Sequence, residues 1–80
     1  MQVVLKRSVN QVKNGYLARA PQLRLTAYGP SAELASKNLE YLVAHYLRPF
    51  ERGGSLEREL AAAGVEKREG EAPLTILLLD

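Results

Sequence analysis

Hydrophobic and polar residues alternate along the first part of the chain in the way typical of β-strands. Over residues 2–10, one phase of the alternation holds Val3, Leu5 and Val9, and the other begins with Val4 and continues through polar side chains. A period of two is the pattern of a strand with one buried face. We therefore expect a strand over residues 2–10, with Arg7 interrupting its apolar phase.

Turn residues separate two further strands. Asn14-Gly15 is a strong hairpin signal, because both residues tolerate positive φ angles. The chain then returns as a strand from Gly15 to Ala20, which Pro21 ends because proline has no amide hydrogen for the ladder. A third strand is expected over Leu23–Tyr28, where apolar and polar residues alternate again. Together these strands predict a three-stranded antiparallel meander.

A change of period marks a long helix after the meander. Apolar residues recur at three- and four-residue spacing from Ala32 to Arg48: Ala35, Leu39, Leu42, Val43, Tyr46 and Leu47. Ser31 is placed to cap the first turn with its hydroxyl, and Glu33 lies where the helix dipole favours a negative charge. Pro49 is expected to end the helix.

The last third of the chain predicts a short helix, a loop and a final strand. Ser55 is expected to cap a helix that runs through Ala63, with Gly64 as its C-terminal cap. Residues 65–73 are charged and contain a glycine and a proline, so we expect a loop there. The run Leu74–Leu79 is apolar in both phases apart from Thr75, which predicts a strand covered on both faces.

This order of elements predicts an α+β fold in two layers. It consists of the three-stranded antiparallel meander, the long helix, the short helix and a C-terminal strand that returns beside the first strand. Eighty residues are enough for one thin core, so we expect a single domain over residues 1–80.

A sheet with helices on one side leaves its other face to water, yet the final strand is apolar on both sides. We therefore expect a homodimer or a larger homo-oligomer with that strand near the interface. The alternative is that the helix over residues 55–63 folds back and covers the strand. The side chains expected at the dimer interface are Leu74, Ile76, Leu77 and Leu78.

Composition narrows the class of protein. Apolar residues make up 46% and charged residues 25%, which is the balance of a globular domain rather than of a disordered tail. The chain has no cysteine, so disulfide scaffolds and thiol nucleophiles are excluded. No apolar run approaches the ~20 residues of a membrane-spanning helix. The first residues also lack the apolar stretch of a signal peptide, and we expect a cytoplasmic, non-membrane protein.

Charge is distributed unevenly along the chain. Residues 1–30 contain five basic residues and no acidic ones, whereas residues 31–80 contain six basic and nine acidic residues. If the apolar phase of the third strand faces the helix, basic side chains and a tyrosine share the outer face: Lys6, Arg19, Arg24 and Tyr28. Such a face is a candidate platform for RNA or for a partner protein. The alternative is that Tyr28 packs across a strand pair beside solvated bases.

Candidate chemistry is sparse. A nuclease built on such a sheet needs carboxylates that hold metal ions, one of them on the first strand, and residues 2–10 have none. His45 is the only histidine, so we expect no zinc site in a chain without cysteine. Gly53-Gly54 is not followed by the Lys-Ser or Lys-Thr of a phosphate loop. We expect no catalytic, metal or cofactor site, and thus no enzyme.

A series of short motifs recurs at a particular order and spacing: Gly15-Tyr16, Pro21-x-Leu23, Gly29, Ser31, Glu33 and Ala35, followed by a helix with Tyr46-Leu47. This series resembles the HicB-like family, the antitoxin half of HicAB toxin–antitoxin modules. The resemblance covers residues 1 to about 48 and departs from the family at Arg24-Leu25-Thr26 and Pro30. It implies a partial ribonuclease-H-like sheet with one helix.

The resemblance also implies a function. HicB-like proteins bind and neutralise HicA-like toxins, which are small, basic, RNA-cleaving proteins, without being enzymes themselves. We expect this chain to be such an interaction domain, and the acidic second half to suit a basic partner better than the basic sheet face does. No segment remains within residues 1–80 for the DNA-binding module of many HicB antitoxins, so operator binding is not expected. The alternative function is a standalone nucleic-acid-binding module.

Overall fold

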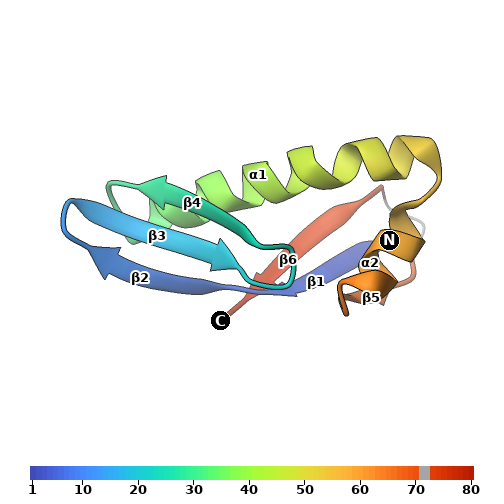
Figure 1. Ribbon diagram of the computed structural model, residues 1–80, viewed down its shortest axis with the longest axis horizontal. Coiled ribbons are helices and arrows are strands. Elements are labelled where there is room, and N and C mark those ends of the chain that lie inside the picture. The colour runs from blue at the N-terminus through green and yellow to red at the C-terminus, as the bar shows by residue number, and fades with distance from the viewer. Residues whose placement is uncertain (71–72) are drawn as a thin grey trace.

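The computed structural model describes residues 1–70 and 73–80. Within these residues, eight elements follow one another (Figure 1): β1 (Gln2–Lys6), β2 (Ser8–Val12), β3 (Gly15–Ala20), β4 (Leu25–Gly29), α1 (Ala32–Gly53), α2 (Leu56–Ala62), β5 (Glu66–Arg68) and β6 (Thr75–Leu79). The predicted α+β fold is confirmed: an antiparallel meander, a long helix, a short helix and a last strand beside the first.

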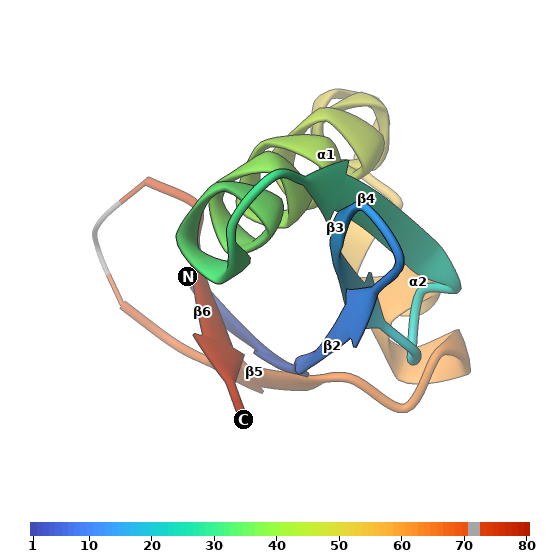
Figure 2. The ribbon, with the colours of Figure 1, turned by 90° about the vertical axis from the view of Figure 1, so that its left-hand side faces the viewer.

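The strand predicted over residues 2–10 forms two strands that belong to two sheets. β2, β3 and β4 make the antiparallel meander, whereas β1 lies between β5 and β6, antiparallel to the former and parallel to the latter. The change of partners occurs at Arg7, where the sequence pattern is interrupted. Figure 2 shows the molecule end-on: the two sheets diverge from the continuous segment formed by β1 and β2, and α1 lies across both sheets.

The core lies between α1 and the concave faces of both sheets. Val3 and Leu5 are fully buried on β1 and Val9 packs against the core, which confirms the predicted inward phase. The helix contributes four buried side chains at every fourth position: Ala35, Leu39, Val43 and Leu47. This spacing keeps a single stripe of the helix against the sheets.

The helix α1 begins as predicted but extends beyond its predicted end. The Ser31 hydroxyl accepts a hydrogen bond from the Leu34 amide at 3.2 Å, which confirms the N-cap. Pro49 lies inside the helix, so its expected role as a terminator is wrong. Proline removes one hydrogen bond of the helix backbone. Phe50 nevertheless packs on the core, and its ring meets that of Tyr46 edge-on with the ring centroids 5.4 Å apart. These contacts favour another turn, which ends at Gly54 with φ of 77°.

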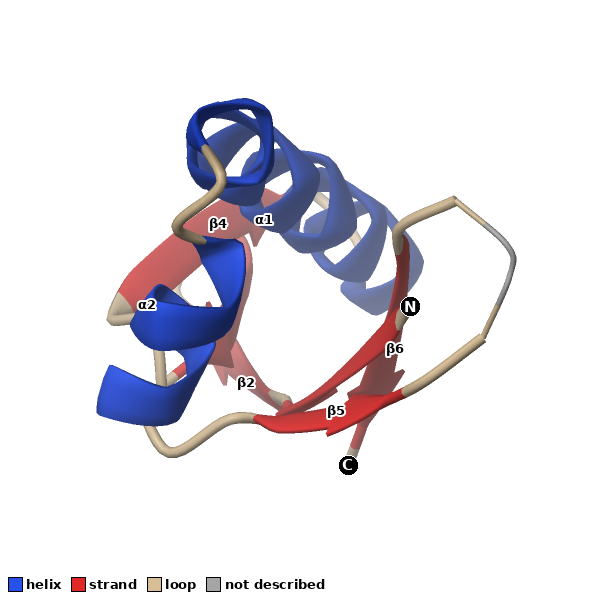
Figure 3. Cartoon of the chain, turned by 90° about the vertical axis from the view of Figure 1, so that its right-hand side faces the viewer, coloured by secondary structure: helices blue, strands red, loops and turns tan. Residues whose placement is uncertain are grey.

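The short helix lies on the β5 side of the molecule. α2 packs against α1 and β5, and Figure 3 shows it across the molecule from β6. It buries Leu56 and Leu60 and ends one residue before the predicted end, with Ala63 as its C-cap and a left-handed Gly64 directly after it. The Ser55 hydroxyl makes no capping bond. The alternative in which this helix covers the last strand is therefore wrong.

The loop predicted over residues 65–73 contains a strand. β5 pairs with β1 from Gln2 to Val4. Its Glu66 and Arg68 side chains are exposed, and charged side chains are a common protection for a strand at a sheet edge. The high charge that indicated a loop is therefore the composition of an edge strand. Residues 71–72 of the predicted loop lie outside the described residues.

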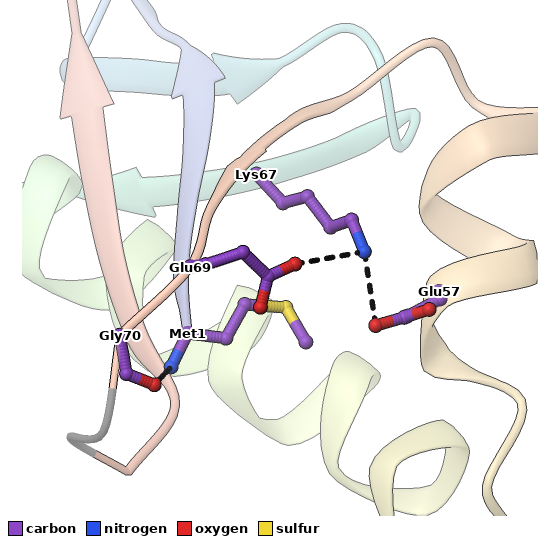
Figure 4. A network of polar contacts seen from close by, with 5 residues as sticks. All are labelled: Met1, Glu57, Lys67, Glu69 and Gly70. Carbon is purple, nitrogen blue, oxygen red and sulfur yellow. Dashed lines mark hydrogen bonds and ion pairs between the residues drawn. The ribbon is translucent and has the colours of Figure 1, made fainter.

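An ion-pair network links α2 to β5 (Figure 4). The Lys67 ammonium lies 2.9 Å from a Glu57 carboxylate oxygen and 3.2 Å from one of Glu69. The hydrogen bond to Glu57, and then that to Glu69, raises the pKa of Lys67 above its ordinary 10.5. Because both carboxylates are solvent-exposed, the network contributes little to stability.

The sign of the Lys67 shift fixes a pH dependence. A pKa raised by folding gives a stabilising contribution that is complete below 10.5 and is lost as pH rises through the folded-state value. We expect Lys67→Gln to lower the melting temperature slightly at pH 8, and the difference from the wild type to shrink above the lysine pKa. Parallel thermal melts across this range measure the effect. A difference independent of pH would mean that packing of the Lys67 side chain, not its charge, stabilises the fold.

Candidate functional site

The backbone groups of the long first strand point alternately to its two sides. Even-numbered residues of β1 and β2 face β5 and β3, and the Lys6 amide, lying between them, donates to the Gln22 side-chain oxygen at 2.8 Å. Odd-numbered residues face the other side, where the Arg7 amide donates to the Leu79 carbonyl oxygen at 2.7 Å. Beyond Arg7, that other side has no partner strand among the described residues.

The consequence is an open β-edge on β2. Its register with β3 brings Val12 opposite Gly15, across the two-residue turn, so Asn10 and Val12 bond to β3 and the intervening residues point away. The amide and carbonyl groups of Val9 and Gln11 therefore face outward, and no backbone hydrogen bond joins them to another described segment. An extended chain could pair with β2 along this edge.

A cleft of about 800 Å³ lies beside this edge. Its walls come from the start of β2, from the N-terminal half of α1 and from the end of β6. They carry a mixture of apolar and charged side chains: Arg7, Ser8, Val9, Ala32, Glu33, Leu34, Ser36, Lys37, Glu40 and Asp80. Acidic residues outnumber basic ones by three to two, and Leu34 is 46% exposed. The cleft thus combines apolar surface, a slight negative charge and unpaired backbone groups.

An ion pair joins the two sheets at one end of the cleft. The Arg7 guanidinium donates from Nε to the Asp80 carboxylate at 2.8 Å, and a second guanidinium nitrogen lies at the same distance. The Asp80 side chain is 74% exposed, so the pair contributes at most about 1 kcal/mol. Together with the Arg7–Leu79 backbone bond, it holds the end of β6 where the open edge of β2 begins.

A second groove, of about 520 Å³, separates α1 from β6. It shares Lys37 and Glu40 with the cleft and adds Tyr41, which is 76% exposed, and Ile76. The β6 strand forms as predicted. The prediction that both of its faces are covered is wrong for the single chain. None of its side chains is fully buried, and Leu79 is 44% exposed.

The residues predicted for a dimer interface divide between the two faces of β6. Leu74, Ile76 and Leu78 pack against the core, whereas Leu77 lies on the outer face, opposite Val4 of β1. On this outer face Val4 is buried and Leu77 is half-buried. An aliphatic strand whose outer edge has no partner among the described residues is unusual for a natural sheet.

The predicted basic face forms only in part. Arg19 lies opposite Ser8 and Thr26 in the ladders of β3, which places it on the same outer face as Tyr28. Arg24 does not belong to this face, and the prediction of a strand starting at Leu23 is wrong. Residues 21–24 form a turn in which Arg24 has φ of 58° and its amide donates to the Pro21 carbonyl oxygen. Lys6 is exposed on the outer face of the neighbouring sheet, opposite Leu79.

Tyr28 has a structural role on this face. Its hydroxyl donates a short hydrogen bond to the Asn14 carbonyl oxygen, and its ring lies against Gly15, where an added Cβ would be 2.6 Å from the hydroxyl. The Tyr28 ring thus packs across the strand pair of β3 and β4. The side chain is still 51% exposed, so part of the ring can meet a ligand.

The described residues hold neither a metal-binding cluster nor a membrane-spanning helix. Within residues 1–70 and 73–80, no group of three or more histidine and acidic side chains is placed to hold a metal ion. His45 is exposed and its ring stacks on that of Tyr41, with the ring centroids 6.3 Å apart. None of the helices in these ranges has the length and hydropathy to cross a bilayer.

Comparison with known proteins gives no relative from which a role could be transferred. No protein-family model matches the chain, no curated protein is similar to it, and no solved structure matches its fold. The HicB-like resemblance stays a prediction that rests on its motifs.

Proposed function

We propose that the protein is a non-enzymatic, HicB-like interaction domain, an antitoxin-type component in the cytoplasm that binds and neutralises a small RNA-cleaving toxin. The observation that carries the proposal is the open edge of β2 beside the cleft. Unpaired amide and carbonyl groups at Val9 and Gln11 offer main-chain hydrogen bonds to an extended segment of a partner, which is a recurrent mode of protein recognition.

Charge supports a basic partner. The cleft contains Glu33, Glu40 and Asp80 against Arg7, which is already paired with Asp80, and Lys37. A positively charged toxin would be steered toward this side and repelled from the acid-free outer face of the meander. Covering the toxin in this way would block its access to RNA without any chemical step.

The test uses the small HicA-like ribonuclease expected to be encoded beside this chain. We expect the two purified proteins to form a stable complex on size exclusion, and RNA cleavage to stop at stoichiometric addition. Gln11→Pro removes the outward amide and Gln11→Ala keeps it. We expect the proline variant to bind up to about tenfold more weakly than the alanine variant, from one lost hydrogen bond. If no complex forms, the proposed function is wrong. If both variants bind equally well, the toxin does not bind along the edge of β2.

A nucleic-acid-binding module is the second candidate, and one observation favours it. The outward side chains of β2, β3 and β4 include no acidic residue, and they place Arg19 and the exposed part of Tyr28 on one face. We would then expect a salt-dependent gel shift with single-stranded RNA that Arg19→Glu abolishes. Arg24→Glu, in the turn, serves as a control at the edge of this face. The absence of a shift at low salt would remove this candidate.

A further inference from the structure

We propose that two copies of the chain pair through β6, antiparallel across a two-fold axis, so that their β5-β1-β6 sheets join into one six-stranded sheet. The proposal concerns the edge of β6 and goes beyond the toxin-binding role assigned to β2. It rests on three features of β6: the direction of its backbone groups, its apolar side chains and the charges on the adjacent helix.

The backbone groups of β6 define how the second copy would bind. Thr75 donates to the Met1 carbonyl oxygen at 3.1 Å and Leu79 accepts from the Arg7 amide, so the odd-numbered residues bond to β1. The amide and carbonyl groups of Ile76 and Leu78 therefore point to the open edge. An antiparallel copy centred on Leu77 pairs Ile76 of each chain with Leu78 of the other and uses all of these groups.

The side chains on this edge are unusually apolar. Four consecutive aliphatic residues end the strand, and none of them is fully buried by its own chain. Natural edge strands are protected by charges, proline or a covering element. The inner face of β6 packs on the core beneath α1, but between Thr75 and Leu79 the strand has no charge and no proline, and no described segment pairs with its open edge. Pairing through β6 would bring Leu77 against its own copy on the outer face and Ile76 against Leu78 on the inner face.

The charges on α1 favour a second copy over a strongly charged partner. The groove between α1 and β6 is lined by one base, Lys37, and one acid, Glu40. In the proposed dimer, the two-fold axis places the groove of one chain beside the groove of the other. Lys37 of each chain would then lie near Glu40 of the other chain. The surface is therefore complementary to itself, as the interface of a symmetric dimer must be.

Cysteine cross-linking tests the register, because the natural chain has no cysteine. Residues 77 of the two copies would form a non-hydrogen-bonded pair with Cα atoms about 4.5 Å apart, within the range of a disulfide. We expect oxidised Leu77→Cys to form a covalent dimer. Leu79→Cys is the control, because residue 79 would lie opposite residue 75 and far from its copy. A monomer by light scattering at 100 μM would overturn the proposal, as would equal cross-linking of both variants.

A charge exchange tests the symmetry without altering the strand. We expect Lys37→Glu and Glu40→Lys each to weaken the dimer roughly threefold or more, because each sets like charges together. The double variant restores both pairs and should recover the wild-type dissociation constant in light scattering. If the double variant is weaker than either single one, the two-fold arrangement is wrong. Lys37 and Glu40 also line the cleft, so toxin binding is tested only with the Gln11 variants, in which both residues are unchanged. Failure of the dimer therefore leaves that test intact.

Discussion

Gly29→Ala is expected to lower the free energy of unfolding by about 3 kcal/mol, the upper end of the usual cost of overpacking. Gly29 ends β4 and is buried where the sheet meets the first turns of α1. A Cβ added there would lie 2.7 Å from the Leu34 carbonyl carbon and from the Ala35 Cα, with the Ala35 nitrogen closer still. These are backbone atoms of the helix, so the clash is relieved only by moving α1 away from the sheet.

Gly53→Ala is the matched control for this substitution. Nothing lies within 4 Å of a Cβ added at Gly53, the last residue of α1, and alanine favours helix more than glycine does. We expect Gly53→Ala to be neutral or slightly stabilising in urea denaturation, under conditions in which Gly29→Ala is clearly destabilised. Equal stability of the two variants would show that β4 and α1 do not approach as closely as the structure has them.

Leu39→Ala is expected to lower the free energy of unfolding by about 2–5 kcal/mol. Leu39 is fully buried at the middle of the apolar stripe of α1, with Ala35 and Val43 one turn to either side. Its removal loses apolar burial and leaves a cavity that a small domain cannot easily close. Since such domains are stable by only about 5–15 kcal/mol, a large part of the stability should disappear.

Leu34→Ala provides the comparison within the same helix. Leu34 is 46% exposed at the rim of the cleft, so its truncation removes little buried area. We expect a loss well under 1 kcal/mol in chemical denaturation. A Leu34→Ala loss equal to that of Leu39→Ala would mean that the buried stripe of α1 is placed wrongly.

The elements governed by local sequence signals were predictable. Alternation identified the inward phase of the first strand, and the Ser31 cap located the start of α1. Asn14-Gly15 located the hairpin only to within one residue: the turn is Lys13-Asn14, Gly15 begins β3, and neither Asn14 nor Gly15 has a positive φ. Each of these signals depends on neighbours in sequence and needs no knowledge of the tertiary fold. The same is true of β6, whose continuous apolar run is too short for a buried helix.

The errors arose where tertiary contacts override local preference. Pro49 stays within α1 while Phe50 packs on the core one residue later, and β5 is a strand because the first residues of β1 offer it a partner. Arg24 was assigned to a strand by alternation alone, although a turn with a left-handed residue precedes β4. In each case the deciding interaction is with a residue distant in the chain or lies in turn geometry that alternation does not encode.

The candidate site was not predictable for a similar reason. An open edge exists only because β6 ends beside Arg7 while β2 continues, and this depends on which strands pair and for how long. The only sequence signal was the interruption of the apolar phase at Arg7, which marks the exchange of partners. The predicted basic face used the correct outward phase for Arg19 and Tyr28, but the turn at residues 21–24 removed Arg24 from it.

Amide hydrogen exchange, measured residue by residue by NMR on the isolated chain, tests most directly whether β2 offers an open edge. We expect the amides of Val9 and Gln11 to exchange at nearly the rate of an unstructured chain, whereas that of Asn10, bonded to β3, should be strongly protected. If Val9 and Gln11 are protected as well as Asn10, the edge is already occupied and the proposed binding site does not exist.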